Sequence, residues 1–98
     1  MKKPKTVPLE KGFHFYNGTD MPTELMAASL PEFLDCIGKV SAQSLEFHLE
    51  RGDFQNWLGL LGEKRAIQQL DSFAKKGLKG EKLRAGMIEV VKARVGKA

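Results

Sequence analysis

The sequence has little of what disulfide-rich or metal-binding domains need. It contains one cysteine, Cys36, and two histidines, His14 and His48, among 98 residues. One thiol cannot close an internal disulfide, and these few ligands do not stand at the spacing of a zinc site. Cys36 lies beside apolar residues, which favours a buried, unreactive thiol. We therefore expect no metal and no cofactor.

Long apolar runs are also absent. No stretch approaches the ~20 apolar residues that a bilayer-spanning helix requires. The basic start, with Lys2, Lys3 and Lys5, is not followed by the apolar stretch of a secretory signal. We therefore expect a cytoplasmic protein that does not enter a membrane.

Familiar catalytic motifs are missing as well. The segment from Gly77 to Gly80 holds one lysine between two glycines but lacks the Gly-Lys-Ser/Thr that grips a nucleotide, so it indicates a turn between helices. Neither a His-Glu-x-x-His nor a Gly-x-Ser-x-Gly pattern occurs. These absences predict a protein that is not an enzyme.

Charge is unevenly distributed along the chain. The net charge is +4, but residues 21–62 carry six acidic against two basic residues and residues 63–98 carry ten basic against four acidic ones. An acidic middle and a basic C-terminal third suit nucleic acid, an acidic partner, or contacts between copies of the chain.

Helical periodicity dominates after Ser29, where apolar residues recur every three or four positions. Ser29 and Ser41 precede two of these segments as N-caps, Asp53 precedes a third, and glycines close several of them. The pattern predicts helices between Ser29 and Gly38, from Ser41 to Glu50, from Asp53 to Gly62, from about Glu63 to Lys76, and from about Glu81 to Arg94. Residues 45–50 also alternate as a strand would, but the cap before them favours a helix.

The residues before Ser29 are less regular. Residues 1–11 are polar and predict a flexible tail. Residues 12–18 alternate, so we expect an extended segment whose Phe13 and Phe15 plug the helices while His14 and Tyr16 point outward. Residues 20–28 hold helix formers behind Pro22 and allow a short helix. The predicted fold is therefore all-α: one domain over residues 12–95, a compact bundle of four to five short helices with the extended segment packed over it.

The densest polar cluster provides the candidate binding residues His48, Arg51, Asp53 and Trp57. A histidine near a carboxylate can perform acid–base chemistry, so His48 with Asp53 or Glu50 is also a possible catalytic pair. The structural interpretation is simpler: Asp53 caps a helix, Trp57 anchors the core, and His48 bridges helix and loop. We favour the structural interpretation.

Basic residues near the C-terminus suggest a second surface. An alternative nucleic-acid site would use Lys75, Lys76, Lys79, Lys82 and Arg84 to neutralise phosphates. This set lacks the interleaved aromatic or amide side chains that read bases, which favours a solvated helix face.

Three segments together resemble a known family. They are Ser29-Leu30-x-x-Phe33-Leu34, Ser44-Leu45-x-Phe47-His48-Leu49 and Arg51-Gly52-Asp53-Phe54-x-x-Trp57-Leu58, with Phe13-x-Phe15-x-x-Gly18 before them. The pattern is similar to a family of small prokaryotic helical domains catalogued as a domain of unknown function. The resemblance covers about residues 12–75 and departs after Gly62, where Glu63 stands in place of the usual aspartate. It implies a helical module that is often attached to other proteins, and it implies no reaction.

Three functions follow as hypotheses. The first is a non-catalytic helical interaction module that binds an unknown protein partner or associates with itself. The second is a nucleic-acid-binding accessory domain that uses the basic C-terminal third. The third is a small enzyme built on His48. The missing motifs and the divided charge favour the first.

Overall fold

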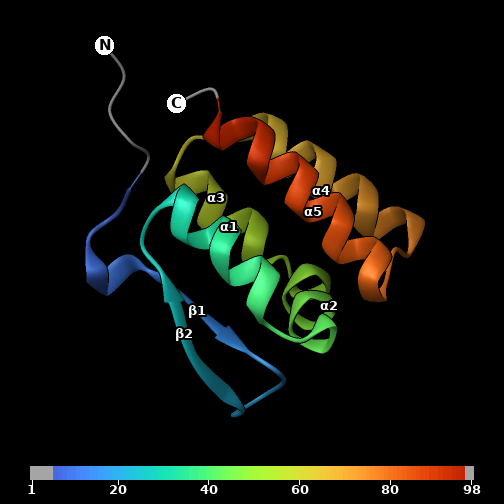
Figure 1. The fold of residues 1–98 in the computed structure, drawn as a ribbon, viewed down its shortest axis with the longest axis horizontal. Helices are drawn as coiled ribbons and strands as arrows, with labels where there is room; N and C mark the ends of the chain where they lie inside the picture. The colour runs from blue at the N-terminus through green and yellow to red at the C-terminus, as the bar shows by residue number, and fades with distance from the viewer. Residues whose placement is uncertain (1–5, 97–98) are drawn as a thin grey trace.

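The computed structural model describes residues 6–96, which form five α-helices and a two-stranded sheet (Figure 1). In chain order the elements are a 3-10 helix η1 (Leu9–Lys11), strands β1 (Phe13–Tyr16) and β2 (Pro22–Ala27), and helices α1 (Leu30–Lys39), α2 (Ala42–Arg51), α3 (Asp53–Leu60), α4 (Lys64–Lys76) and α5 (Gly80–Val95). All five helices predicted after Ser29 are present, although α1 does not end at Gly38 as predicted but continues to Lys39. None of the described helices is long and apolar enough to cross a membrane.

The all-α prediction is wrong before Ser29. Residues 22–27, expected to be a short helix if structured, form β2, which pairs antiparallel with β1 through Phe13↔Ala27 and His14↔Met26. A bulge on β2 follows, and Glu24 within it has a φ of 70°. Pairing with β1 therefore decides the conformation here and overrides the helix preference of these residues.

The segment before β1 is also attached to the fold. Residues 1–5 of the predicted flexible tail lie outside the described residues, whereas Thr6 forms an isolated antiparallel bridge with Ser29. The N–H of Val7 donates to the carbonyl oxygen of Ala28 at 2.8 Å, and η1 follows. Residues 6–11 thus run beside the end of β2.

Serine caps explain where α1 and α2 begin. Ser29 Oγ and Ser41 Oγ each accept a hydrogen bond from the N–H three residues later, as predicted. The prediction that Asp53 caps α3 is wrong, because Asp53 is the first residue of that helix and Gly52 stands at the cap. Gly52 also ends α2, with a φ of 77° in the left-handed region that glycine adopts readily. One glycine therefore forms the whole corner between α2 and α3.

Aromatic rings join the hairpin to the helices. Phe13 and Phe15 of β1 are buried against Phe33 of α1 and Phe54 and Trp57 of α3, with ring centroids 4.8–6.1 Å apart. This confirms that Phe13 and Phe15 plug the core. Figure 1 shows the hairpin on one side of α1 and the α4–α5 pair on the other. Packing of these rings therefore holds β1 against α1 and α3.

The α4–α5 pair closes the far side of the bundle. Leu83, Met87, Val90 and Val91 of α5 are buried, as their spacing predicted. Gly86 lies under Phe73 of α4: a Cβ at Gly86 would stand 3.1 Å from the ring. The glycine inside this helix thus permits the close approach of α4 and α5.

Two glycine substitutions test the packing of the hairpin. A Cβ at Gly12 would lie 3.0 Å from the carbonyl oxygen of Ala27 and 2.5 Å from Met26 Sδ. We expect Gly12→Ala to lower the free energy of unfolding by about 1–3 kcal/mol, because backbone must move to admit the methyl group. Gly38→Ala is the matched control, since no atom would lie within 4 Å of a Cβ added there. We expect it to raise stability by about 0.5–1 kcal/mol in urea unfolding. Equal effects of the two changes would contradict this packing.

Candidate functional site

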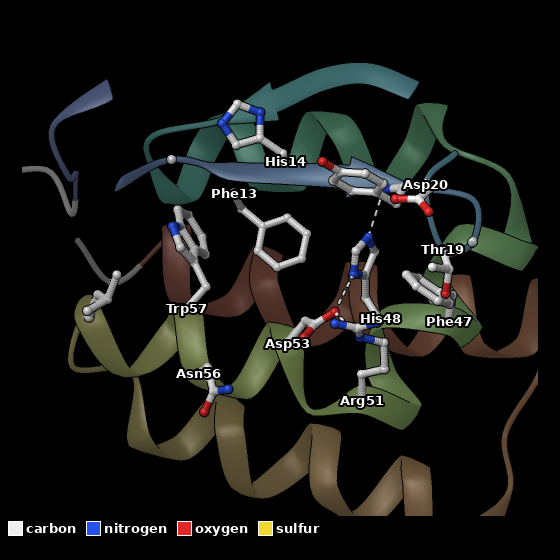
Figure 2. A pocket seen from close by; sticks show the side chains of 14 residues that line it. Phe13, His14, Thr19, Asp20, Phe47, His48, Arg51, Asp53, Asn56 and Trp57 are labelled. Atoms are coloured by element: carbon white, nitrogen blue, oxygen red, sulfur yellow. Dashed lines mark hydrogen bonds and ion pairs between the residues drawn. The ribbon is translucent and has the colours of Figure 1, made fainter. Parts of the chain in front are cut away.

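A surface cleft of about 650 Å³ opens between β1 and the corner that joins α2 to α3 (Figure 2). One wall comes from β1 and the hairpin turn, and the other from α2 and α3. The lining residues are Gly12, Phe13, His14, Tyr16, Gly18, Thr19, Asp20, Phe47, His48, Arg51, Asp53, Asn56, Trp57 and Leu60. The volume is within the range of about 300–1,000 Å³ typical of ligand pockets.

His48 connects the two walls of this cleft. The N–H of Tyr16 in β1 donates to His48 Nε2 at 2.8 Å, and His48 Nδ1 lies 2.8 Å from Asp53 Oδ2. Since Nε2 accepts, the neutral ring carries its proton on Nδ1 and donates it to Asp53. Figure 2 shows His48 between the strand above and Asp53 below. Both ring nitrogens are therefore occupied within the fold.

Burial controls the charge of this histidine. His48 is only 3% exposed. Burial lowers the pKa of His48 below its ordinary value of 6.5, while the hydrogen bond and the charge of Asp53 act in the opposite direction. The nearby charge of Arg51 lowers the pKa further. The ring is therefore neutral at pH 7, and its contact with Asp53 is a hydrogen bond between a neutral donor and a carboxylate.

Arg51 and Asp53 meet at the mouth of the cleft. Arg51 Nε lies 3.2 Å from Asp53 Oδ2, and the guanidinium stands 5.0 Å from the centroid of the Phe47 ring. The Arg51 side chain is 56% exposed, so this pair contributes little to stability. The pair instead affects the charge at the mouth of the cleft, because the positive charge of Arg51 and the negative charge of Asp53 largely cancel.

Trp57 forms the apolar end of the cleft. Its ring is 5% exposed and packs on Phe13 and Phe33, while Nε1 donates to the carbonyl oxygen of Lys11 at 3.0 Å. Leu60, one turn further along α3, lines the same end and is 57% exposed. The exposed Leu60 side chain is therefore the apolar surface that a ligand can reach at this end, with the buried Trp57 ring behind it.

The structure brings all four candidate binding residues, His48, Arg51, Asp53 and Trp57, to this one cleft. Sequence reasoning missed the rest of the lining. Phe47 and Asn56 flank the predicted residues in the sequence, and their helical spacing is the signal that could have found them. The hairpin turn at Gly18–Asp20 gave no such signal, since its position depends on β2.

The chemistry available to the cleft is limited. Glu50, the other carboxylate suggested for His48, is exposed and pairs with Lys79 at 3.4 Å, and it does not line the cleft. Across residues 6–96 no three histidine, cysteine or carboxylate side chains gather as metal ligands would. His48 does not add a free ring nitrogen to the cleft, because Nε2 and Nδ1 are both hydrogen-bonded within the fold.

The basic residues of the alternative nucleic-acid site do not act alike. Lys75, Lys76 and Lys82 are exposed, and Lys79 contacts Glu50. Arg84 is different, because its side chain is 18% exposed and Nη1 donates to the carbonyl oxygens of Ile37 and Val40 at 2.7 and 2.6 Å. Arg84 thus satisfies carbonyls at the end of α1.

Arg84→Ala should therefore lower the free energy of unfolding by about 1.5–3 kcal/mol, since charged hydrogen bonds to partly buried carbonyls are lost. Lys82→Ala, an exposed neighbour on α5, is the control and should change stability by less than about 0.5 kcal/mol. Urea unfolding of both variants gives the comparison. A neutral effect of Arg84→Ala would leave that side chain available for phosphate contacts.

Comparisons with known proteins provide one family match. A family model described as "Family of unknown function (DUF5752)" matches residues 1–92. No curated protein and no solved structure matches the chain.

Proposed function

This chain belongs to the DUF5752 family of unknown function, and from that premise we propose that it is a non-catalytic interaction module that binds its partner in the cleft beside β1. The observation that carries the proposal is the convergence of His48, Arg51, Asp53 and Trp57 on one cleft. These residues come from separate turns of two helices, and the wall opposite them comes from a hairpin far away in the sequence.

The character of the lining supports binding. Leu60, with the buried Trp57 ring behind it, offers apolar surface at one end, and Arg51, Asp53 and Asn56 offer polar groups along the rim. Ligand sites commonly combine an apolar floor with a few fixed polar groups. The hydrogen bonds of His48 to both walls hold this arrangement in place before any ligand arrives.

The hydrogen bonding of His48 supports the non-catalytic part of the proposal. A general base needs a nitrogen that can reach a substrate proton. Here Nε2 accepts from the backbone of Tyr16 and Nδ1 donates to Asp53, so neither nitrogen is directed at the open space. We propose that this histidine positions the cleft walls.

Nuclear magnetic resonance tests the proposal with simple probes. We would titrate ¹⁵N-labelled protein with each of the twenty N-acetyl amino acid methylamides and record amide and indole shifts. Apolar and aromatic probes should shift residues 12–20, the α2–α3 corner and the Trp57 indole, with affinities on the order of millimolar. The probes should be recovered chemically unchanged.

Two leucine variants provide the control. Leu60→Glu places a charge on the apolar end of the cleft and should abolish these shifts, whereas Leu9→Glu changes a residue that is 71% exposed and outside the lining. Shifts distributed away from the cleft, or shifts unaffected by Leu60→Glu, would overturn the binding site. Conversion of a probe into a product would overturn the non-catalytic part.

A further inference from the structure

The outer edge of β1 faces the cleft. In a regular strand, the N–H and C=O of one residue point to the same edge, and they alternate from residue to residue. The backbone N–H and C=O of Phe15 point toward β2, because the carbonyl oxygen of Phe15 accepts a hydrogen bond from Thr23 Oγ1 at 2.8 Å. The backbone N–H of Tyr16 points away from β2 and donates to His48 Nε2. His14 lies two residues before Tyr16 in the strand, so its backbone N–H and C=O also point away from β2, toward the cleft that His14 lines.

The bulge does not disturb this alternation. Between the paired positions His14↔Met26 and Tyr16↔Pro22, β1 has one residue and β2 has three. The extra residues are therefore on β2, and β1 remains regular. At this edge the N–H of Tyr16 already donates to His48, so β1 offers the N–H and C=O of His14 and the C=O of Tyr16 to a further strand. A strand edge that is not covered by its own sheet is a template for such pairing, and extended peptides often bind in this way.

The charge of the cleft indicates which side chains such a peptide would carry. Arg51 and Asp53 pair with each other, and His48 is held neutral. The remaining charged residue of the cleft lining is Asp20, on the exposed hairpin turn. Within the described part of the chain, no cationic side chain pairs with Asp20. The cleft therefore has a net negative charge in a chain whose overall charge is +4. A basic side chain complements it.

The two ends of the cleft differ. Figure 2 shows Trp57 and Asp20 toward opposite sides of the view, with β1 running between them. Phe13, Trp57 and Leu60 line the apolar end. We propose that the cleft binds an extended peptide as a short third strand that pairs with β1 at His14, with an apolar side chain on Leu60 and a lysine or arginine side chain beside Asp20. This inference rests on the proposed function, since it names the partner of the same cleft.

Capped threonine heptapeptides test this inference directly. Leucine and lysine stand at the third and fifth positions, in both orders, so that either strand direction is tested. At least one order should bind more tightly than the single amino acid amides, with shifts at His14 and Trp57. Replacement of lysine by glutamate should weaken binding. Equal binding of the lysine and glutamate peptides would overturn the charge assignment.

N-methylation separates strand addition from simple burial of side chains. Methyl groups on the odd residues or on the even residues block hydrogen bonding along opposite edges of the same peptide. Strand addition requires that one methylated series loses binding and the other retains it. If both series bind like the parent, or both fail, the strand-addition proposal is overturned.

Asp20→Asn tests the charge from the side of the protein. Asp20 has a φ of 59°, a conformation that asparagine adopts more readily than most residues, so the turn should be preserved. The variant should bind the lysine peptide roughly two- to fivefold more weakly and should lose the preference for lysine over glutamate. Asp35→Asn, an exposed acid on α1 outside the cleft, should change neither. An unchanged preference in Asp20→Asn would place the selectivity elsewhere.

The two proposals fail in different ways. If no probe and no peptide shifts the cleft residues, the proposed function is wrong and this inference falls with it. If the single amides shift the cleft but the peptides bind no more tightly, only the strand-addition inference is wrong.

Discussion

Trp57→Ala should lower the free energy of unfolding by about 3–5 kcal/mol, a large part of the roughly 5–15 kcal/mol that stabilises a domain of this size. The ring is nearly fully buried and packs on Phe13 of β1 and Phe33 of α1. Its removal leaves a cavity at the point where hairpin and helices meet. Urea unfolding followed by far-UV circular dichroism measures the loss, since the variant has no tryptophan left to fluoresce.

Trp57→Phe is the matched control. It retains an aromatic ring against Phe13 and Phe33 but removes the Nε1 donor that bonds to the carbonyl oxygen of Lys11. We expect a loss of about 1–2 kcal/mol, mainly from that hydrogen bond. A near-normal stability for Trp57→Ala would mean that the ring is exposed, and the apolar end of the cleft would then need a different description.

His48→Phe should lower the free energy of unfolding by about 2–4 kcal/mol, although it keeps a ring of similar size. The wild-type ring packs on Phe13 and Phe54, contacts that phenylalanine can retain. The variant cannot accept the N–H of Tyr16 or donate to Asp53. Leaving buried polar groups without partners is costly, whereas the packing change is small.

The same histidine predicts a pH dependence. The pKa of His48 is lower in the folded chain than the value of 6.5 expected after unfolding. Below about pH 6.5 the unfolded chain therefore binds a proton that the folded chain does not, and the free energy of unfolding falls as the pH falls, by up to about 1.4 kcal/mol per pH unit. The decrease ends once the pH passes below the pKa of the folded state. Stability is therefore fully present above about pH 6.5.

Unfolding between pH 5 and 7.5 measures this slope. His14→Gln, at the exposed histidine of β1, should keep the wild-type slope, whereas His48→Phe should lose most of it. If His48→Phe and wild type have the same slope in this range, the protonation of another group controls the stability.

The helices after Ser29 could be predicted because their information is local. Apolar spacing, serine caps and terminal glycines act within one or two turns, and the structure confirms these helices. Strand β2 could not be predicted in this way. Leu25, Met26 and Ala27 favour a helix on their own, and they become a strand only because β1 offers a partner and the aromatic cluster fixes β1 in place.

Only the helical wall of the candidate site could be predicted. His48, Arg51, Asp53 and Trp57 lie within ten residues, so helical geometry alone could bring them together. The role given to Asp53 was wrong, because Asp53 is the first residue of α3, one position past the cap, and its carboxylate accepts a hydrogen bond from His48 instead. The opposite wall depends on a long-range contact between Tyr16 and His48, which no local pattern indicates.

The backbone conformation of Gly52 makes this corner sensitive to the handedness of any residue that replaces the glycine. Its φ of 77° and ψ of 13° suit a D-amino acid as well as they suit glycine. No atom would lie within 4 Å of a methyl group there, so space is not the constraint. A chemically synthesised chain with D-alanine at this position should therefore keep the bend between α2 and α3, while the mirror-image L-alanine should strain it. The angle at which Asp53 meets His48 therefore depends on the left-handed backbone conformation of one residue.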